Sequence, residues 1–164
     1  MKTTKFIISA VLAMASATVN AESIEGLIVG VADGDTVTLL TPEKIQVKIR
    51  VQGIDAPERS QAFGNVSRQA MAKVVFQKNV NAQCSSTDRY GRKICVIYAN
   101  GVDAGLQLVN QGLAWHYKQY AKEQSPRDRA GYAYAEENAR AQRVGLWSEP
   151  NPMAPWDFRK SQRN

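Results

Sequence analysis

The sequence has very little histidine and cysteine, and this scarcity limits the chemistry it can carry out. Among its 164 residues there is one histidine, His116, and there are two cysteines. A mechanism that pairs two histidines is therefore excluded, and a four-ligand zinc site cannot be built without carboxylates. If the protein is a hydrolase, it must work with carboxylates, arginines, hydroxyls or a hard metal ion.

Long apolar runs are also scarce. One uncharged, mostly apolar or small run covers residues 6–19; two lysines precede it, and Ala21 follows it just before a polar segment. This order is typical of a secretory signal peptide cleaved after Ala21, and the run is short for a membrane span, which needs ~20 residues. The alternatives are a short buried helix or an uncleaved anchor. We expect residues 1–21 to be removed and the protein to be exported, periplasmic or secreted, without stable membrane association.

Acidic residues are outnumbered by basic ones. The chain carries 21 Lys and Arg against 15 Asp and Glu, and residues 1–21 hold two of the lysines and no acid, so 19 against 15 leaves a net charge of +4 after cleavage. This excess favours a polyanionic partner, although charge that merely keeps the protein soluble gives the same balance. The length predicts a single domain, here residues 22–149, followed by a Pro-containing basic tail, residues 150–164. A monomer is the default expectation.

Short strands are predicted in the first half of the mature chain and helices mainly in the second. Alternating or β-branched apolar residues predict strands near residues 23–31, 36–40, 45–50, 80–84 and 93–98. Helical spacing predicts helices near residues 65–78 with Asn65 as the cap, near 103–111 and near 125–143. The tail is expected to be held by Trp147 and Trp156 and to be otherwise loose. This order predicts an α+β fold, mainly a small β-barrel capped by helices.

The two cysteines lie on either side of a turn-like segment, residues 88–91 (DRYG). Cys84 and Cys95 are placed symmetrically about the Arg89–Tyr90 bond, so they would face each other in a hairpin centred there. An exported protein meets an oxidising compartment, and we therefore predict a disulfide between them. The alternative is two buried free thiols.

Four segments carry residues suited to chemistry. They are residues 33–36 (DGDT), Arg50 with residues 54–58 (IDAPE), residues 88–92 (DRYGR) and residues 115–120 (WHYKQY). Each alone has a structural explanation: a common turn, a strand exit, a solvated strand arginine and aromatic packing. Together they predict a phosphodiesterase site. Carboxylates on two loops would bind a hard divalent cation, two arginines would bind phosphate, and a further carboxylate would activate water.

These segments resemble the signature of a known family in order and spacing. DGDTVTL, ten further residues and then RVQGIDAPE resemble the first motif of the staphylococcal nuclease (thermonuclease) family, and DRYGR resembles its second motif. Residues 112–114 and 145–147 resemble later segments of the family. The resemblance covers about residues 23–149, nearly all of the mature chain.

The resemblance implies an OB-fold, a five-stranded barrel capped by about three helices. It also implies calcium-dependent hydrolysis of DNA and RNA that leaves 3′-phosphates, with another divalent cation as the alternative and with single-stranded or breathing regions favoured. The cysteine pair would be an addition that the best-known members lack. The matching positions are the metal ligands Asp35, Asp55 and (through its backbone carbonyl) Ala56, the general base Glu58, the phosphate-binding Arg50 and Arg92, and the substrate-binding Arg89, Tyr90, Tyr117 and Tyr120.

Two other classes of function compete with the enzyme. One is an OB module that binds nucleic acid without catalysis, and the other is a basic exported protein that binds anionic envelope polymers. A module that had lost catalysis would lack some of the acids and arginines, yet all five side chains with assigned catalytic or metal-binding roles are present. An envelope-binding protein leaves the carboxylates unexplained. We therefore predict the nuclease.

Overall fold

The computed structural model describes residues 22–163, and the predicted signal peptide, residues 1–21, lies outside the described residues. No helix within residues 22–163 is long and apolar enough to cross a membrane. The elements in chain order are β1 (Glu22–Val31), β2 (Thr36–Leu40), β3 (Gln46–Val51), β4 (Ile54–Asp55), α1 (Gly64–Val75), β5 (Asn79–Thr87), β6 (Lys93–Ala99), β7 (Val102–Asp103), α2 (Ala104–Asn110), β8 (Trp115–His116), the 3-10 helix η1 (Lys118–Glu123), α3 (Pro126–Ala141), the 3-10 helix η2 (Gly145–Ser148) and α4 (Pro155–Ser161).

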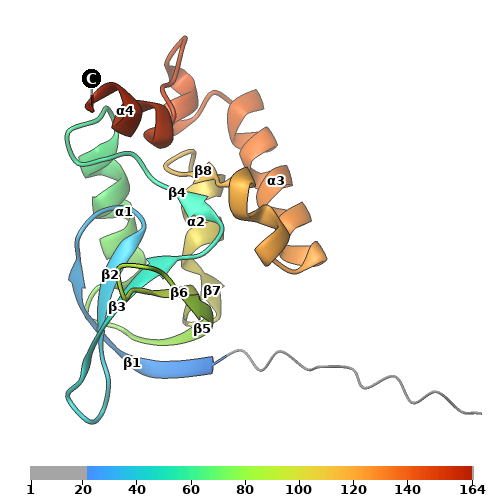
Figure 1. The fold of residues 1–164 in the computed structure, drawn as a ribbon. Helices are drawn as coiled ribbons and strands as arrows, with labels where there is room; N and C mark the ends of the chain where they lie inside the picture. The colour runs from blue at the N-terminus through green and yellow to red at the C-terminus, as the bar shows by residue number, and fades with distance from the viewer. Residues whose placement is uncertain (1–21, 164) are drawn as a thin grey trace, which may run out of the picture.

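Five strands form a closed barrel, as the sequence predicts (Figure 1). Their order is β3-β2-β1-β5-β6 with antiparallel neighbours, and a parallel pairing of β3 with β6 closes the cylinder. β4 and β8 form a separate two-stranded pair, in which Asp55 lies opposite Trp115. The predicted α+β class and the OB-type barrel are confirmed.

The barrel interior follows from the alternation of apolar residues along the strands. Val37 and Leu39 of β2 and Ile49 and Val51 of β3 are almost fully buried, while the residues between them are more exposed. Burying side chains of this size typically contributes about 1.5–3 kcal/mol each relative to exposure. Met71 and Val75 of α1 pack into the same core.

The three predicted helices are present, with one correction at a helix start. The sequence predicts Asn65 as the cap of the first helix, but α1 begins at Gly64, after Phe63 in a left-handed conformation with no side-chain cap. The start of α3 is as expected, because Ser125 accepts a hydrogen bond from the backbone of Asp128 and Pro126 occupies the first turn.

The C-terminal segment, which the sequence pattern predicts to be mostly loose, forms a helix. After Ala154, which is buried, the chain forms α4, and Figure 1 shows this helix above β4 and β8. Ala154 belongs to a second apolar cluster with Trp115 and Trp147, and Trp156 packs against this cluster. The tail is therefore attached to the domain at the end of the barrel that carries β4.

Cys84 and Cys95 form a disulfide across the β5–β6 hairpin. The two residues are register partners, with a β-bulge directly after Cys84, and their Cα atoms are 4.0 Å apart. Both cysteines are buried in the barrel core. The bridge joins two adjacent barrel strands and closes a loop with a sequence separation of 11 residues.

Reducing this disulfide should lower the free energy of unfolding by about 2–3 kcal/mol, because the bridge restricts the unfolded chain through a short loop. Denaturant unfolding of the oxidised and reduced wild-type protein measures the difference without changing a side chain. A thiol count after denaturation without reductant is the control. Two reactive thiols in that count would show that the bridge does not form.

Candidate active site

Asp35 is held at the start of β2 by its own turn. Its backbone N–H donates to Asp33 Oδ1 at 3.0 Å, and its side-chain Oδ1 accepts from the Thr36 hydroxyl at 3.1 Å. Gly34 is required in this turn, because a Cβ there would lie 2.0 Å from the Ser67 hydroxyl of α1. The second carboxylate oxygen, Oδ2, accepts from the backbone N–H of Ala56 at 2.7 Å. The turn thus presses against α1 and aims Asp35 at the end of β4.

Asp55 and Ala56 come from the β4 segment that faces this turn. Asp55 is fully buried, and its backbone position is fixed by the pairing of β4 with β8. Burial raises the pKa of Asp55, and the Asp35 charge adds to this effect, while Arg159 and Arg50 oppose it. Burial and the Asp35 charge also raise the pKa of Asp33, to about 6. Asp33 and Asp55 are thus harder to ionise than free aspartates, first because they are buried and second because Asp35 carries a negative charge beside them.

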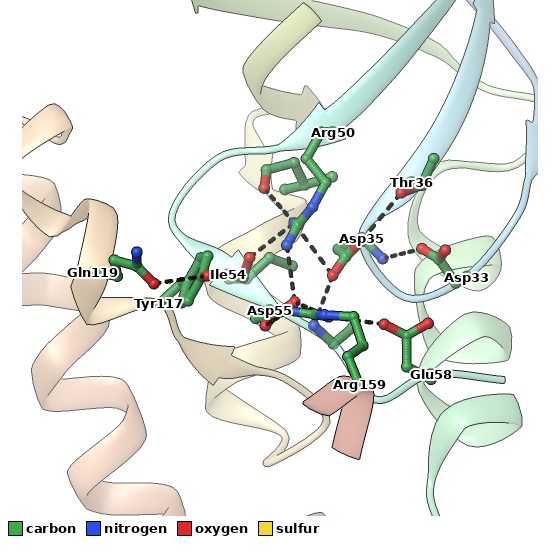
Figure 2. A network of polar contacts seen from close by, with 12 residues as sticks. Asp33, Asp35, Thr36, Arg50, Ile54, Asp55, Glu58, Tyr117, Gln119 and Arg159 are labelled. Atoms are coloured by element: carbon green, nitrogen blue, oxygen red, sulfur yellow. Dashed lines mark hydrogen bonds and ion pairs between the residues drawn. The ribbon is translucent and has the colours of Figure 1, made fainter. Parts of the chain in front are cut away.

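Arg50 joins the two aspartates through one guanidinium (Figure 2). Its Nη1 lies 3.2 Å from Asp35 Oδ2, and its Nη2 lies 3.0 Å from Asp55 Oδ1. Nη1 also donates to the backbone carbonyls of Val51 at 3.1 Å and Ile54 at 2.8 Å. Since these partners belong to the tight turn between β3 and β4, the guanidinium is fixed in place by the fold.

Glu58 lies on the loop between β4 and α1. Its side chain is 36% exposed, in contrast to the buried aspartates. The loop is closed by hydrogen bonds from the Gln61 backbone to Glu58 and from the Gly64 backbone to Gln61. Gly64 permits this closure, because a Cβ there would lie 1.9 Å from the Glu58 carbonyl oxygen. The loop places an accessible carboxylate beside a buried pair.

A second arginine reaches the same carboxylates from α4. Arg159 Nη2 donates to Asp55 Oδ2 at 2.8 Å, and Arg159 Nη1 donates to Glu58 Oε1 at 2.8 Å and to Asp55 Oδ1 at 3.2 Å (Figure 2). The hydrogen bonds to Asp55 and Glu58 raise the pKa of Arg159 above its usual value. No motif of the sequence indicates Arg159, and Asp33 lies in the DGDT motif without an expected role of its own.

Arg92 lies outside this cluster, in the β5–β6 hairpin. Its Nε donates to Asp88 Oδ2 at 2.8 Å, and within residues 22–163 no ion pair joins it to Asp35, Asp55 or Glu58. The parallel pairing of the barrel sets Arg50 opposite Ile94, two residues after Arg92. The hairpin therefore runs beside the strand of Arg50, although the Arg92 guanidinium is held by Asp88.

The predicted substrate-binding residues fall into two groups. Tyr90 is 69% exposed at the hairpin tip, with the Arg89 and Arg92 guanidiniums 5.0 and 5.6 Å from its ring centroid. Tyr117 and Tyr120 form the other group, with ring centroids 5.1 Å apart. The Tyr117 backbone N–H donates to the Gly53 carbonyl, in the turn between Arg50 and Asp55, so this tyrosine borders the carboxylate cluster.

His116, the residue before Tyr117, has a structural role. Its side chain is buried, and its Nε2 lies 2.8 Å from Gln124 Oε1. Burial lowers the pKa of His116, an effect that the hydrogen bond with Gln124 opposes. Burial therefore favours the neutral imidazole ring of His116. His116 is not part of the carboxylate cluster.

The donor set fits a hard divalent cation. Carboxylate and carbonyl oxygens are the ligands that calcium prefers, and Asp35, Asp55 and the Ala56 carbonyl are of this kind. Four carboxylates in this region face only two guanidiniums, which leaves an excess of negative charge. Within the described residues, no group of three or more His, Cys, Asp or Glu side chains is arranged to hold a metal ion. A coordination sphere here would therefore need backbone carbonyl and water oxygens as well.

Comparison with known proteins decides the family. The family model described as staphylococcal nuclease homologue matches residues 48–149, which is more than half of the chain. The chain belongs to the staphylococcal nuclease family. The matched range of the family model includes Arg50, Asp55, Glu58 and Arg92, begins after Asp35 and ends before Arg159.

Curated relatives agree with this assignment. A micrococcal nuclease of Shigella flexneri is 39% identical over 148 residues, which cover 85% of this chain and 82% of that protein. An uncharacterised endonuclease of Haemophilus influenzae is 40% identical over 136 residues, covering 83% of this chain and 73% of that protein. A staphylococcal-like nuclease of Arabidopsis thaliana is 40% identical over 116 residues, which cover 71% of this chain and 34% of that protein. The predicted family is confirmed, and the chain is a nuclease of this staphylococcal type.

Proposed function

We propose that this protein is an exported, sugar-nonspecific, calcium-dependent nuclease that hydrolyses phosphodiester bonds of DNA and RNA and leaves 3′-phosphate ends. The observation that carries the proposal is the convergence of Asp35, Asp55 and Glu58 around the Arg50 and Arg159 guanidiniums. A module that only bound nucleic acid would have no use for buried carboxylates beside a site for an anion, because they repel phosphate.

The aspartates would hold the metal ion, together with the Ala56 carbonyl. When bound there, calcium supplies positive charge that offsets the charge developing on the phosphate. Asp33 orients Asp35 by accepting its backbone N–H. The buried position of Asp55 excludes bulk water and strengthens the electrostatic interactions at the site.

Arg50 is the phosphate-binding arginine that the geometry supports best. A guanidinium has five N–H donors, and hydrogen bonds to Val51, Ile54 and Asp55 use three of them. The Nε–H and one Nη2–H remain for the phosphate oxygens. Because the other three bonds fix the plane of the group, the remaining donors are oriented before substrate binds.

Glu58 is the proposed general base. Its Oε1 accepts from Arg159, while no described residue donates a hydrogen bond to its Oε2. This oxygen can take a proton from water as the water oxygen bonds to phosphorus and the P–O5′ bond breaks. The products are then a 3′-phosphate and, once the leaving oxygen has gained a proton, a 5′-hydroxyl.

The remaining assigned residues would contact the flanking nucleotides. Arg92 is proposed as the second phosphate-binding arginine, which requires it to exchange Asp88 for phosphate. Arg89 and Tyr90 lie at the exposed hairpin tip, and Tyr117 and Tyr120 provide aromatic faces beside the site. Aromatic stacking with basic side chains tolerates any base and favours unpaired strands.

The test is cleavage of single-stranded DNA and RNA by the protein lacking residues 1–21, first with calcium and then with excess chelator. We expect cleavage with calcium, loss of cleavage in chelator, and 3′-phosphate ends on the products. The same assay with magnesium or manganese identifies the metal preference. Salt-sensitive binding of DNA without cleavage under any of these ions would contradict the proposal and support a binding module.

A further inference from the structure

The C-terminal helix α4 brings two side chains onto the proposed active site. Arg159 contacts Asp55 and Glu58, and Trp156, three residues earlier, stacks on Tyr117. Residues three apart lie on the same face of a helix. One face of α4 therefore covers both the carboxylates proposed for catalysis and an aromatic ring proposed for substrate binding.

Arg159 contacts both oxygens of a proposed metal ligand, Asp55, and one oxygen of the proposed base, Glu58. Its two terminal nitrogens lie within 3.2 Å of both Asp55 carboxylate oxygens and of Glu58 Oε1. Arg50 already donates to Asp55 Oδ1 at 3.0 Å. Oδ1 of Asp55 thus has two cationic partners and Oδ2 has one, so a metal ion that approaches Asp55 is repelled by guanidinium charge at both oxygens until Arg159 moves away.

The helix is attached independently of this ion pair. The ring centroids of Trp156 and Tyr117 are 5.5 Å apart with an interplanar angle of 15°, and those of Trp156 and Trp115 are 5.4 Å apart. Gln61 Nε2 donates to the Met153 carbonyl at 2.7 Å, which ties the segment before α4 to the Glu58 loop. The Arg159 side chain is 35% exposed. It can therefore rotate into solvent while the rest of α4 stays in place.

We propose that Arg159 is a built-in cation that competes with the metal ion for Asp55 and at the same time binds the proposed base, Glu58. The inference rests on the proposed function, because it assumes that Asp55 is a metal ligand and that Glu58 is the base beside it. Arg159 neutralises the carboxylates while the metal is absent and withdraws when it binds. The site is then available only for the fraction of time that Arg159 is displaced, which reduces its apparent metal affinity to that fraction of the intrinsic value.

The test is calorimetric titration of calcium into three proteins that lack only residues 1–21: wild type, Arg159→Gln and Lys160→Gln. Lys160 is the matched control, because it is exposed on the same helix and its side chain has no ion pair with the described residues. We expect Arg159→Gln to bind calcium about tenfold more tightly than wild type, as for a site open about a tenth of the time. Lys160→Gln should stay within about twofold of wild type, since only a screened surface charge is lost.

Arg159→Lys provides a second variant with the charge retained. The lysine side chain has one nitrogen and cannot contact Asp55 and Glu58 through a planar fork. We therefore expect Arg159→Lys to have a calcium affinity intermediate between those of wild type and Arg159→Gln. If wild type binds calcium and cleaves DNA, equal calcium affinities in wild type, Arg159→Gln and Lys160→Gln would overturn this inference and leave the proposed function standing. Lower cleavage by Arg159→Gln with unchanged calcium affinity would also overturn the inference, because it would show that Arg159 acts on the substrate and not on metal binding. A wild type that neither binds a divalent metal nor cleaves would instead contradict the proposed function.

Discussion

Replacing Arg50 with alanine should lower kcat for DNA cleavage by about 10³-fold or more, the scale seen when a phosphate-binding arginine is lost in phosphoryl transfer. The reason is geometric as well as electrostatic. Arg50 is held by two backbone carbonyls and by Asp55, so its remaining donors meet phosphate without reorganisation. Alanine removes those donors, and it also leaves Asp35 and Asp55 without the cation between them.

Two further variants separate these effects. Arg50→Lys keeps the positive charge but loses the planar fork, so cleavage should still fall well below wild type. Lys48→Ala removes a positive charge two residues earlier on β3, where the side chain is exposed, and should leave kcat unchanged. Single-turnover cleavage, with circular dichroism to check the fold, gives the comparison. Near-wild-type turnover in Arg50→Ala would show that Arg50 is not the phosphate-binding group.

The barrel could be predicted from the sequence because its signals are local. Alternating apolar residues identify β2 and β3, and the turn at residues 88–91 fixes the hairpin in which Cys84 faces Cys95. The start of α1 was missed for the opposite reason. Asn65 has the right chemistry for a cap, but the loop that positions Glu58 closes against Gly64, and the helix begins there. Tertiary packing overrides a weak local preference in this case.

The carboxylate cluster could be predicted in the same way, from two short segments that each place carboxylates on a loop. Arg159 was not predicted, because 104 residues separate it from Asp55 and no periodic pattern links them. Its position depends on the packing of Trp156 and Ala154 against the apolar cluster of Trp115 and Trp147. The basic C-terminal segment signals only a general affinity for anions. Which of its basic residues meets a carboxylate is decided by the orientation of α4.

Replacing Glu58 with glutamine should lower kcat by about 10²–10⁴-fold, the usual contribution of general base catalysis. Glutamine keeps the size of the side chain and can still accept the hydrogen bond from Arg159 through its carbonyl oxygen, but it cannot take a proton from water. Since Glu58 is 36% exposed and lies outside the buried aspartate pair, the substitution should leave the fold intact. Binding of uncleaved DNA, measured in calcium at short times, should change little, because the lost interaction belongs to the transition state.

The matched control is Glu43→Gln in the turn between β2 and β3. Glu43 is exposed and lies outside the cluster, so its neutralisation tests whether loss of one negative charge on this basic protein alters cleavage by long-range attraction of DNA. Wild-type kcat in Glu43→Gln, with a large loss in Glu58→Gln and unchanged DNA affinity, would assign the effect to proton transfer. If Glu58→Gln instead retained kcat, the base would have to be another group, and the accessible Oε2 of Glu58 would have no catalytic role.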